Sequence, residues 1–221
     1  MTKQTWFLVA ALSLAPVAAG AQAEPSPDPE KRAKLERRGG GLRVGPWWPR
    51  DLAEEPGVAY AQTPAFEAWG QEGLDLHLAI ESAVGFWSRS QELERTDAFG
   101  GTTRQQVQTY VVPLFAGLRA HPLTTPGAGL EPYLLGAIGV ALGVDDRSGD
   151  GGPFGEPAGT TAQAGFGFKA GAGVDVRLGQ AFGVTMGARY QWLRFGEALG
   201  GERTYRGVGV DVGLTYRFQY R

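Results

Sequence analysis

The sequence predicts an all-β protein, an eight-stranded antiparallel up-and-down β-barrel, and three observations support this fold. First, eight stretches alternate apolar and polar residues with a period of two, as strands do when successive side chains point to opposite faces. Second, short turns and long loops alternate along the chain. Third, glycine is abundant, at 35 of 221 residues, and cysteine is absent. An even number of strands brings both ends of the chain to the same side of the membrane.

The residues before the first strand have the features of a targeting segment and an arm. Lys3 precedes an apolar stretch over 6–19, and Ala21-Gln22-Ala23 has the small-x-small pattern of a cleavage site. We predict a signal peptide over residues 1–23, cleaved after Ala23, because the apolar stretch is too short for a membrane anchor. Residues 24–40 are rich in proline and charge, which predicts a disordered periplasmic arm. The barrel domain is predicted over residues 41–221.

The alternation is clearest in the sixth stretch, over 163–177. Phe166 and Phe168 fall on one face there, and Lys169 and Asp175 fall on the other. The same division recurs in the third stretch (76–89), the seventh (182–192) and the last (207–220), and with more noise in the fourth (105–120) and fifth (131–145). The first (41–49) and second (63–71) stretches are short, so their register is the least firmly specified.

The connections between stretches differ in length. Those after the first, third, fifth and seventh stretches are long, over 50–62, 91–104, 146–161 and 197–203. Those after the second, fourth and sixth are shorter, near 70–75, 121–129 and 178–181. Long loops on one side and short turns on the other are typical of barrels in the bacterial outer membrane, with both chain ends in the periplasm.

The composition of the two faces indicates which one points outward. One face is broadly apolar, whereas the other carries Gly, Thr, Gln and charges of both signs. Eight strands leave an interior that side chains just fill, and glycines on the polar face leave room there for long charged chains. On a solvent-facing side those glycines would only weaken the strands. We therefore predict a transmembrane barrel with lipid against the apolar face and the polar face in the lumen.

The charged residues of the inner face are expected to form a network of salt bridges and hydrogen bonds, because unpaired buried charge is costly. Such a network obstructs the lumen and leaves at most a narrow path for ions or water. Trp47, Trp69 and Trp87 also fall on this face, so either they plug the lumen or the register of the first strands is shifted by one residue. The predicted network comprises Arg43, Glu67, Glu81, Arg119, Glu131, Lys169, Asp175, Arg177, Arg189, Asp211 and Arg217.

The chain resembles the small outer-membrane β-barrel family that includes the OmpA transmembrane domain, OmpX and OmpW. The resemblance covers about residues 41–221 and rests mainly on architecture. One motif is more specific, because Asp211, Gly213, Tyr216 and Phe218 match the family pattern polar-x-Gly-x-x-aromatic-x-aromatic. The resemblance implies that this pattern is the signal recognised by the outer-membrane assembly machinery. Family members usually end on the aromatic residue, whereas this chain continues to Arg221.

Catalysis requires a base beside a nucleophile. The chain has two histidines, His77 on the predicted lumen face and His121 in a predicted turn, while Ser82 and Ser88 are predicted to face lipid. This arrangement does not match the Ser–His pair of a lipid A deacylase, and we predict no enzymatic activity. The absence of cysteine excludes thiolate chemistry, and the formal charge of −2 with no basic block indicates no nucleic-acid partner.

Two further motifs are weaker. The Gly/Asp-rich run over 145–152 lacks the spacing of an EF-hand, so a mobile loop is favoured over a calcium site. Gly165, Gly167 and Gly171 lie within a continuous alternation and open no helix, which excludes a dinucleotide loop. We therefore predict no cofactor and no metal.

The leading functional hypothesis is a structural or surface-interaction barrel of the bacterial envelope, localised in the outer membrane. Its expected partners are outer-membrane lipid, the assembly machinery during biogenesis, and an extracellular ligand that the sequence does not identify. Three alternatives remain open. The first is a narrow channel for ions or small solutes, whose conductance Lys169→Ala or Glu131→Ala would change. The others are a lipid-modifying enzyme and a soluble periplasmic lipid carrier, in which the apolar face would line the inside and the polar face would contact water.

Overall fold

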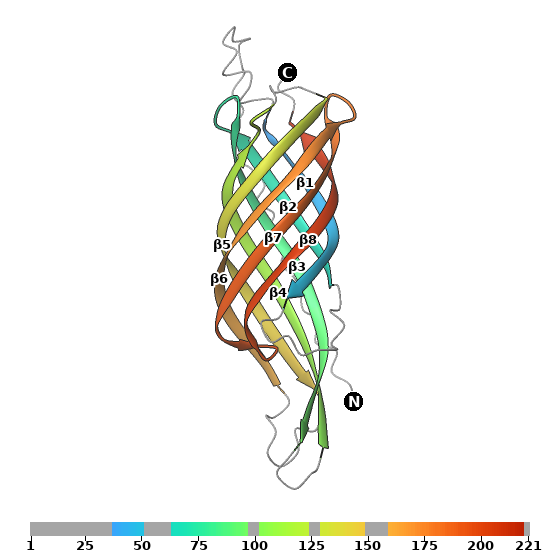
Figure 1. Cartoon of the computed structure of the whole chain (residues 1–221), viewed down its shortest axis with the longest axis vertical. Coiled ribbons are helices and arrows are strands. Elements are labelled where there is room, and N and C mark those ends of the chain that lie inside the picture. Colours follow the sequence, from blue (N-terminus) through green and yellow to red (C-terminus); the bar gives the residue numbers. More distant parts are fainter. Residues whose placement is uncertain (1–36, 51–62, 97–101, 124–128, 149–158, 219–221) are drawn as a thin grey trace.

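The computed structural model describes residues 37–50, 63–96, 102–123, 129–148 and 159–218. These residues form a closed barrel of eight strands, with each strand hydrogen-bonded to the next along the chain and the last to the first (Figure 1). The predicted fold class is confirmed. The strands are β1 Gly39–Arg50, β2 Thr63–Gly73, β3 Leu78–Thr96, β4 Thr102–Ala120, β5 Leu130–Ser148, β6 Gly159–Arg177, β7 Phe182–Leu199 and β8 Glu202–Arg217.

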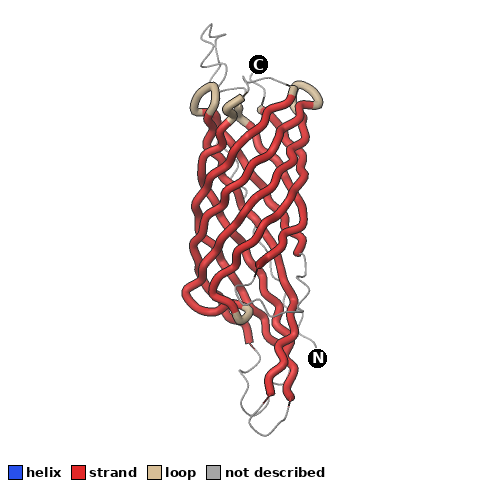
Figure 2. Tube along the Cα trace, in the orientation of Figure 1, coloured by secondary structure: helices blue, strands red, loops and turns tan. Residues whose placement is uncertain are grey.

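All eight pairings are antiparallel, and the seam between β1 and β8 closes the barrel with Gly39 opposite Arg217 and Leu42 opposite Leu214. The strands are tilted relative to the long axis of the barrel (Figure 1), as closure of a sheet requires. Figure 2 shows short connections gathered at one end, where β1 begins and β8 ends. We call this end the turn end, and the opposite end the loop end.

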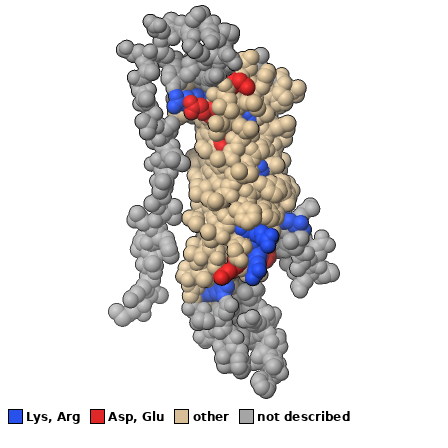
Figure 3. Space-filling view, turned by 90° about the vertical axis from the view of Figure 1, so that its left-hand side faces the viewer, with Lys and Arg blue, Asp and Glu red and all other residues tan. Residues whose placement is uncertain are grey.

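Apolar side chains cover the outside of the barrel. Along β8, for example, Val208, Val210, Val212, Leu214 and Tyr216 are all exposed, as the alternation predicts. Figure 3 shows the result on one face of the barrel, a largely uncharged band in the middle with most of the charged side chains near the two ends. Such a band is the arrangement of a barrel whose outer surface contacts lipid.

Aromatic rings lie near both edges of this band. Toward the loop end, the Phe168 ring stacks on that of Trp192 with centroids 5.6 Å apart. Toward the turn end, Tyr216 contacts Phe182 at 5.3 Å and Phe218 at 5.6 Å. Aromatic rings in these positions form the girdles that anchor a membrane barrel at its two interfaces.

The connection between β7 and β8 differs from the prediction. The long loop expected over 197–203 is a tight turn at Gly200 and Gly201, with φ of 56° and 86°. Two consecutive positive φ values are those of a type I′ hairpin turn, which glycine adopts without a Cβ penalty. The Asp145 carboxylate accepts a hydrogen bond from the Gly200 N–H, so β5 holds the turn in place.

The hairpin of β3 and β4 is also longer than predicted. Pairing continues to Thr96 opposite Thr102, within the segment over 91–104 that was predicted to be a loop. The β2 register with β3 ends at Ala65 opposite Trp87, so the tip of the hairpin extends beyond its neighbour on that side (Figure 1).

The barrel begins before residue 41. Arg37 and the start of β1 at Gly39 belong to it, which corrects the boundary predicted for the arm. The signal peptide over 1–23 and the arm over 24–36 lie outside the described residues. Within the described ranges, no helix is long and apolar enough to cross a membrane.

Candidate functional site in the barrel lumen

The lumen is the candidate functional site, because its side chains fall into two layers of opposite character. Charged residues fill the middle and the turn end, whereas apolar residues fill the loop end. The layers meet at Lys169, whose Nζ lies 5.1 Å from the centre of the Phe115 ring. Glycines on the inner face leave the space that these long side chains occupy.

Glu67 of β2 is the centre of the charged layer. Its carboxylate pairs with the Arg43 guanidinium, lies 2.7 Å from Arg189 Nη1, and accepts hydrogen bonds of 3.1 Å to both oxygens from Lys169 Nζ. Arg189 also contacts Asp211 at 2.8 Å. One carboxylate therefore joins cations from β1, β6 and β7, which surround it on three sides.

A second carboxylate, that of Glu81, extends the network toward the turn end. It lies 2.6 Å from Arg43 and 3.2 Å from Arg119. Arg119 is fully buried, and its Nη1 contacts Asp175 at 3.2 Å. Its guanidinium also stacks over the Tyr133 ring, 3.6 Å from the ring centre. Planar stacking of this kind partly compensates arginine for the water it has lost.

A third carboxylate closes the turn end. Glu131 of β5 lies 3.0 Å from Arg217 of β8 and 3.4 Å from Arg37. Arg37 also donates from Nε to the Leu76 carbonyl at 3.0 Å. The residues just before β1 thus bind inside the mouth of the barrel, and they tie it to β5 and to the turn between β2 and β3.

His121 follows β4 at the turn end, beside the predicted turn, and is fully buried. Burial and the neighbouring charges of Arg37, Arg119 and Arg217 lower its pKa to about 3. The ring is therefore neutral at physiological pH. His77 was predicted to face the lumen, but it lies in the turn before β3 and is exposed. Its Nδ1 lies 3.1 Å from the His121 carbonyl oxygen.

Ten of the eleven residues predicted for the network lie in the charged pairs described above. The eleventh, Arg177, is half-buried at the turn end, where its backbone N–H donates to the Gly129 carbonyl at 2.8 Å. In the predicted assembly motif, Tyr216 and Phe218 point outward, while Asp211 points inward to Arg189.

An apolar plug fills the lumen at the loop end. Trp47 and Trp87 pack with ring centroids 4.7 Å apart, and Tyr205 packs against Trp87 at 5.3 Å and Phe195 at 5.9 Å. All four rings are buried. The predicted inward register is confirmed for Trp47, Trp69 and Trp87. Of these, Trp47 and Trp87 belong to the plug. The cluster comprises Trp47, Trp87, Val111, Phe115, Ala137, Ala141, Leu193, Phe195, Leu199 and Tyr205.

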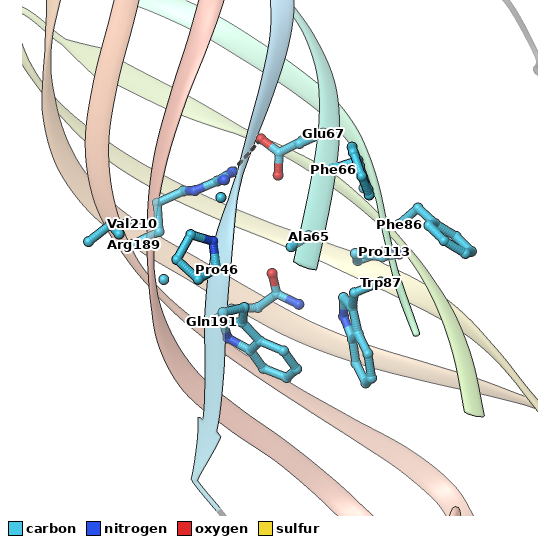
Figure 4. A pocket seen from close by; sticks show the side chains of 14 residues that line it. Pro46, Ala65, Phe66, Glu67, Phe86, Trp87, Pro113, Arg189, Gln191 and Val210 are labelled. Atoms are coloured by element: carbon cyan, nitrogen blue, oxygen red, sulfur yellow. Dashed lines mark ion pairs between the residues drawn. The ribbon is translucent and has the colours of Figure 1, made fainter. Parts of the chain in front are cut away.

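A small cavity of about 30 Å³ lies beside the plug, where Pro46 and Pro113 interrupt the strand ladders (Figure 4). Gln191 and Trp87 point toward it, and the Arg189–Glu67 pair forms its polar wall. A cavity of this size has room for about one or two water molecules. It provides no space for a larger ligand.

The serines and histidines considered as a catalytic pair do not come together in the described residues. Ser82 and Ser88 lie on the outward face of β3, whereas both histidines lie at the turn end. Asp145 and Asp146 of the Gly/Asp-rich run contact Thr109 and Thr160, and the rest of that run lies outside the described residues. In the described ranges, His, Asp and Glu form no group suited to a metal ion.

Two features of the lumen were not predicted from the sequence, namely the binding of Arg37 inside the mouth and the members of the apolar plug other than its tryptophans. A signal for the plug was present, because Val111 and Phe115 have the inward parity of β4, and they made its alternation noisy. No local signal marks Arg37, whose partner Glu131 is far away in the sequence.

An outward apolar surface around a lumen closed by charged and apolar layers defines the class of small membrane-spanning β-barrels. Similar solved structures include Ail, the attachment invasion locus protein of Yersinia pestis, at 15% identity over 82% of this chain and 99% of Ail, with a TM-score of 0.49. Neisserial surface protein A is also similar, at 10% identity over 82% of this chain and 97% of that protein, with a TM-score of 0.48. The outer membrane protein OprG from Pseudomonas aeruginosa is 16% identical over 82% of this chain and 94% of OprG, with a TM-score of 0.45. These are small outer-membrane barrels, and the likeness concerns the fold. No family model and no curated protein matches the chain.

Proposed function

We propose that the protein is a non-conducting barrel of the bacterial outer membrane, which stabilises the envelope and presents its loop end to the outside. The observation that carries this proposal is the double closure of the lumen. Charged groups cross-link the strands in the middle and at the turn end, and rings pack against each other at the loop end. A lumen packed in this way holds the wall rigid and leaves no continuous water path.

The outer surface and the sequence signals together support this location. The apolar band and its aromatic edges suit a bilayer, and the predicted signal peptide over 1–23 would direct the chain across the inner membrane. The outward Tyr216 and Phe218 are accessible to an assembly factor before the strands close. The turn end would face the periplasm and the loop end the exterior, so an external partner would meet the connections at the loop end.

Conductance tests the closed lumen. The full chain, refolded into planar bilayers, is expected to insert without discrete channel openings, with a heat-modifiable gel shift showing that it has folded. Replacing both plug rings and one bridging cation, Trp47→Ala and Trp87→Ala with Lys169→Ala, should then produce openings, because both closures of the lumen are weakened. The matched control is Phe86→Ala with Phe166→Ala, which removes two outward rings and should leave the barrel silent.

Openings of the unmodified protein would overturn the closed-lumen proposal and favour the narrow channel. In that event Lys169→Ala and Glu131→Ala would change the conductance, because both side chains lie in the path. Cell fractionation tests the location separately. Recovery in the soluble periplasm would contradict it.

A further inference from the structure

The outer wall at the loop end carries a basic hollow that the closed lumen does not explain. The hollow has a volume of about 550 Å³ and is lined by Ala164, Gly165, Phe166, Arg194, Phe195, Gly196 and Arg203. Both arginines are exposed. Figure 3 shows basic side chains, with some acidic ones among them, near the loop end of the face that it draws.

An irregularity in the β7–β8 pairing forms the hollow. Arg194 pairs with Thr204, whereas Leu199 pairs with Glu202, so several residues of β7 face Arg203 alone. Extra residues in one strand bend it and disrupt the ladder. The β6–β7 register correspondingly ends at Gly165 opposite Phe195. The wall therefore opens between β6 and β7 at this point.

The hollow lies at the height of a lipid headgroup. Below it on β8, apolar outward residues run from Val208 to Tyr216, which agrees with the roughly 9–11 residues that a tilted strand needs to cross a bilayer. Arg206 is the next outward residue of β8, and its β7 neighbour is Trp192. Rings of the aromatic edge thus lie directly beneath the arginines, where the apolar band ends.

Arg194 and Arg203 bring two positive charges to the hollow. Among the described residues, no ion pair is formed by Arg194, Arg203 or Arg206. Of the neighbouring carboxylates, Glu197 accepts a hydrogen bond from Gln163 Nε2 at 2.9 Å, and Glu202 lies 3.4 Å from Arg89. An anion in the hollow would offset the positive charge of Arg194 and Arg203.

We propose that this hollow binds the phosphorylated headgroup of a lipid in the outer leaflet. The lipid's acyl chains would lie on Phe166 and the band below, while Arg194 and Arg203 would hold its phosphate through charge-assisted, bidentate hydrogen bonds. Membrane lipid is the occupant because the hollow is continuous with the apolar surface, so one ligand contacts both. The proposal rests on the membrane location proposed above.

Lipid retention, measured by native mass spectrometry, tests the proposed headgroup site. The full chain is refolded into phosphatidylcholine nanodiscs containing either diphosphoryl lipid A or the same glycolipid without phosphates, and the lipids retained on release into detergent are counted. The unmodified barrel should retain the phosphorylated lipid and lose the other. The double variant Arg194→Gln with Arg203→Gln should retain at least about tenfold less, since each charged hydrogen bond contributes about one decade of affinity.

Arg89→Gln is the matched control, because Arg89 lies near the same rim but pairs with Glu202 at 3.4 Å. It should retain lipid like the unmodified chain. Equal retention by the double variant, or equal retention of the phosphate-free glycolipid, would overturn the proposal. Displacement of the lipid by equimolar inorganic pyrophosphate would also overturn it, by indicating a site for soluble anions. Normal heat-modifiable insertion in any of these cases would leave the proposed membrane location standing.

Discussion

Lys169 of β6 donates hydrogen bonds of 3.1 Å to both carboxylate oxygens of Glu67 on β2, the strand on the diametrically opposite side of an eight-stranded ring. The contact spans the lumen from wall to wall. It also joins residues that are remote in sequence, so it braces the barrel against flattening as well as neutralising two buried charges.

Glu67→Gln tests this brace. The change removes the negative charge that three cations share, and breaking a buried ion pair costs about 3–5 kcal/mol. We expect a loss of that size in the free energy of unfolding, measured by urea titration of the barrel in vesicles. The control is Glu72→Gln on the same strand, whose side chain is exposed and should cost little. A cost for Glu67→Gln no larger than that of the control would contradict the network's role.

Gly173→Ala tests the space that glycines provide in the lumen. A Cβ at Gly173 would lie 2.5 Å from Tyr133 Oη and 2.6 Å from Cζ, on the ring that stacks with Arg119. Overpacking of this kind costs about 1–3 kcal/mol. Gly136→Ala is the control, because a Cβ there meets no atom within 4 Å. The same urea titration should separate the two, and equal midpoints would show that the lumen is more loosely packed than described.

Gly201→Ala tests the hairpin turn. At φ of 86° an alanine Cβ is strained, which costs about 1–2 kcal/mol. Thermal unfolding followed by gel shift should show a lower transition temperature. Gly179→Ala, in the turn between β6 and β7, adds a Cβ in open space with no positive φ and should leave the transition unchanged. A drop of the same size in both variants would point to a cause other than backbone strain.

His121 gives the barrel a dependence on pH. Its folded-state pKa of about 3 lies below the ordinary 6.5, so between these values the unfolded chain binds a proton that the folded chain does not. Stability is therefore complete above about pH 6.5 and falls as the pH decreases toward 3. At one pKa unit per 1.4 kcal/mol, the loss between pH 8 and pH 5 is about 2 kcal/mol.

His121→Gln should flatten this dependence, as measured by urea midpoints at pH 8 and pH 5. The control is His77→Gln, since His77 is the other histidine of the chain and is exposed. It should keep the slope of the unmodified protein. A slope that persists in His121→Gln would assign the dependence to other groups.

The barrel and most of the lumen charges follow from the alternation of apolar and polar residues. The prediction weakens where that alternation is absent. Beyond Arg89 on β3, polar residues such as Gln91 and Glu92 occur at successive positions in the sequence, so apolar and polar residues do not alternate there. Periodicity therefore gives no strand signal there, although the backbone pairs to Thr96. The pair Gly200-Gly201 was a recognised hairpin signal, yet its position in a presumed long loop concealed it.

The plug and the closure of the mouth were less predictable, for different reasons. Phe115 and Val111 point inward beside apolar outward neighbours, so both faces of β4 are apolar near the loop end. A two-sided apolar strand is typical of a buried strand and says nothing about which ring meets which. Arg37 lies in a charged segment that looks solvated, and its burial depends on Glu131, which only the completed barrel brings near.

The seam between β1 and β8 has a kinetic consequence. Every other strand pair joins neighbours in sequence, but this one joins Gly39 to Arg217, so closure has to overcome the loop entropy of nearly the whole domain. Until β8 arrives, two strand edges would face lipid with unsatisfied backbone groups, at several kcal/mol for each. We therefore expect closure of this seam to be the last and slowest step of assembly, and a chain that ends before β8 to lack the pairing that removes both strand edges.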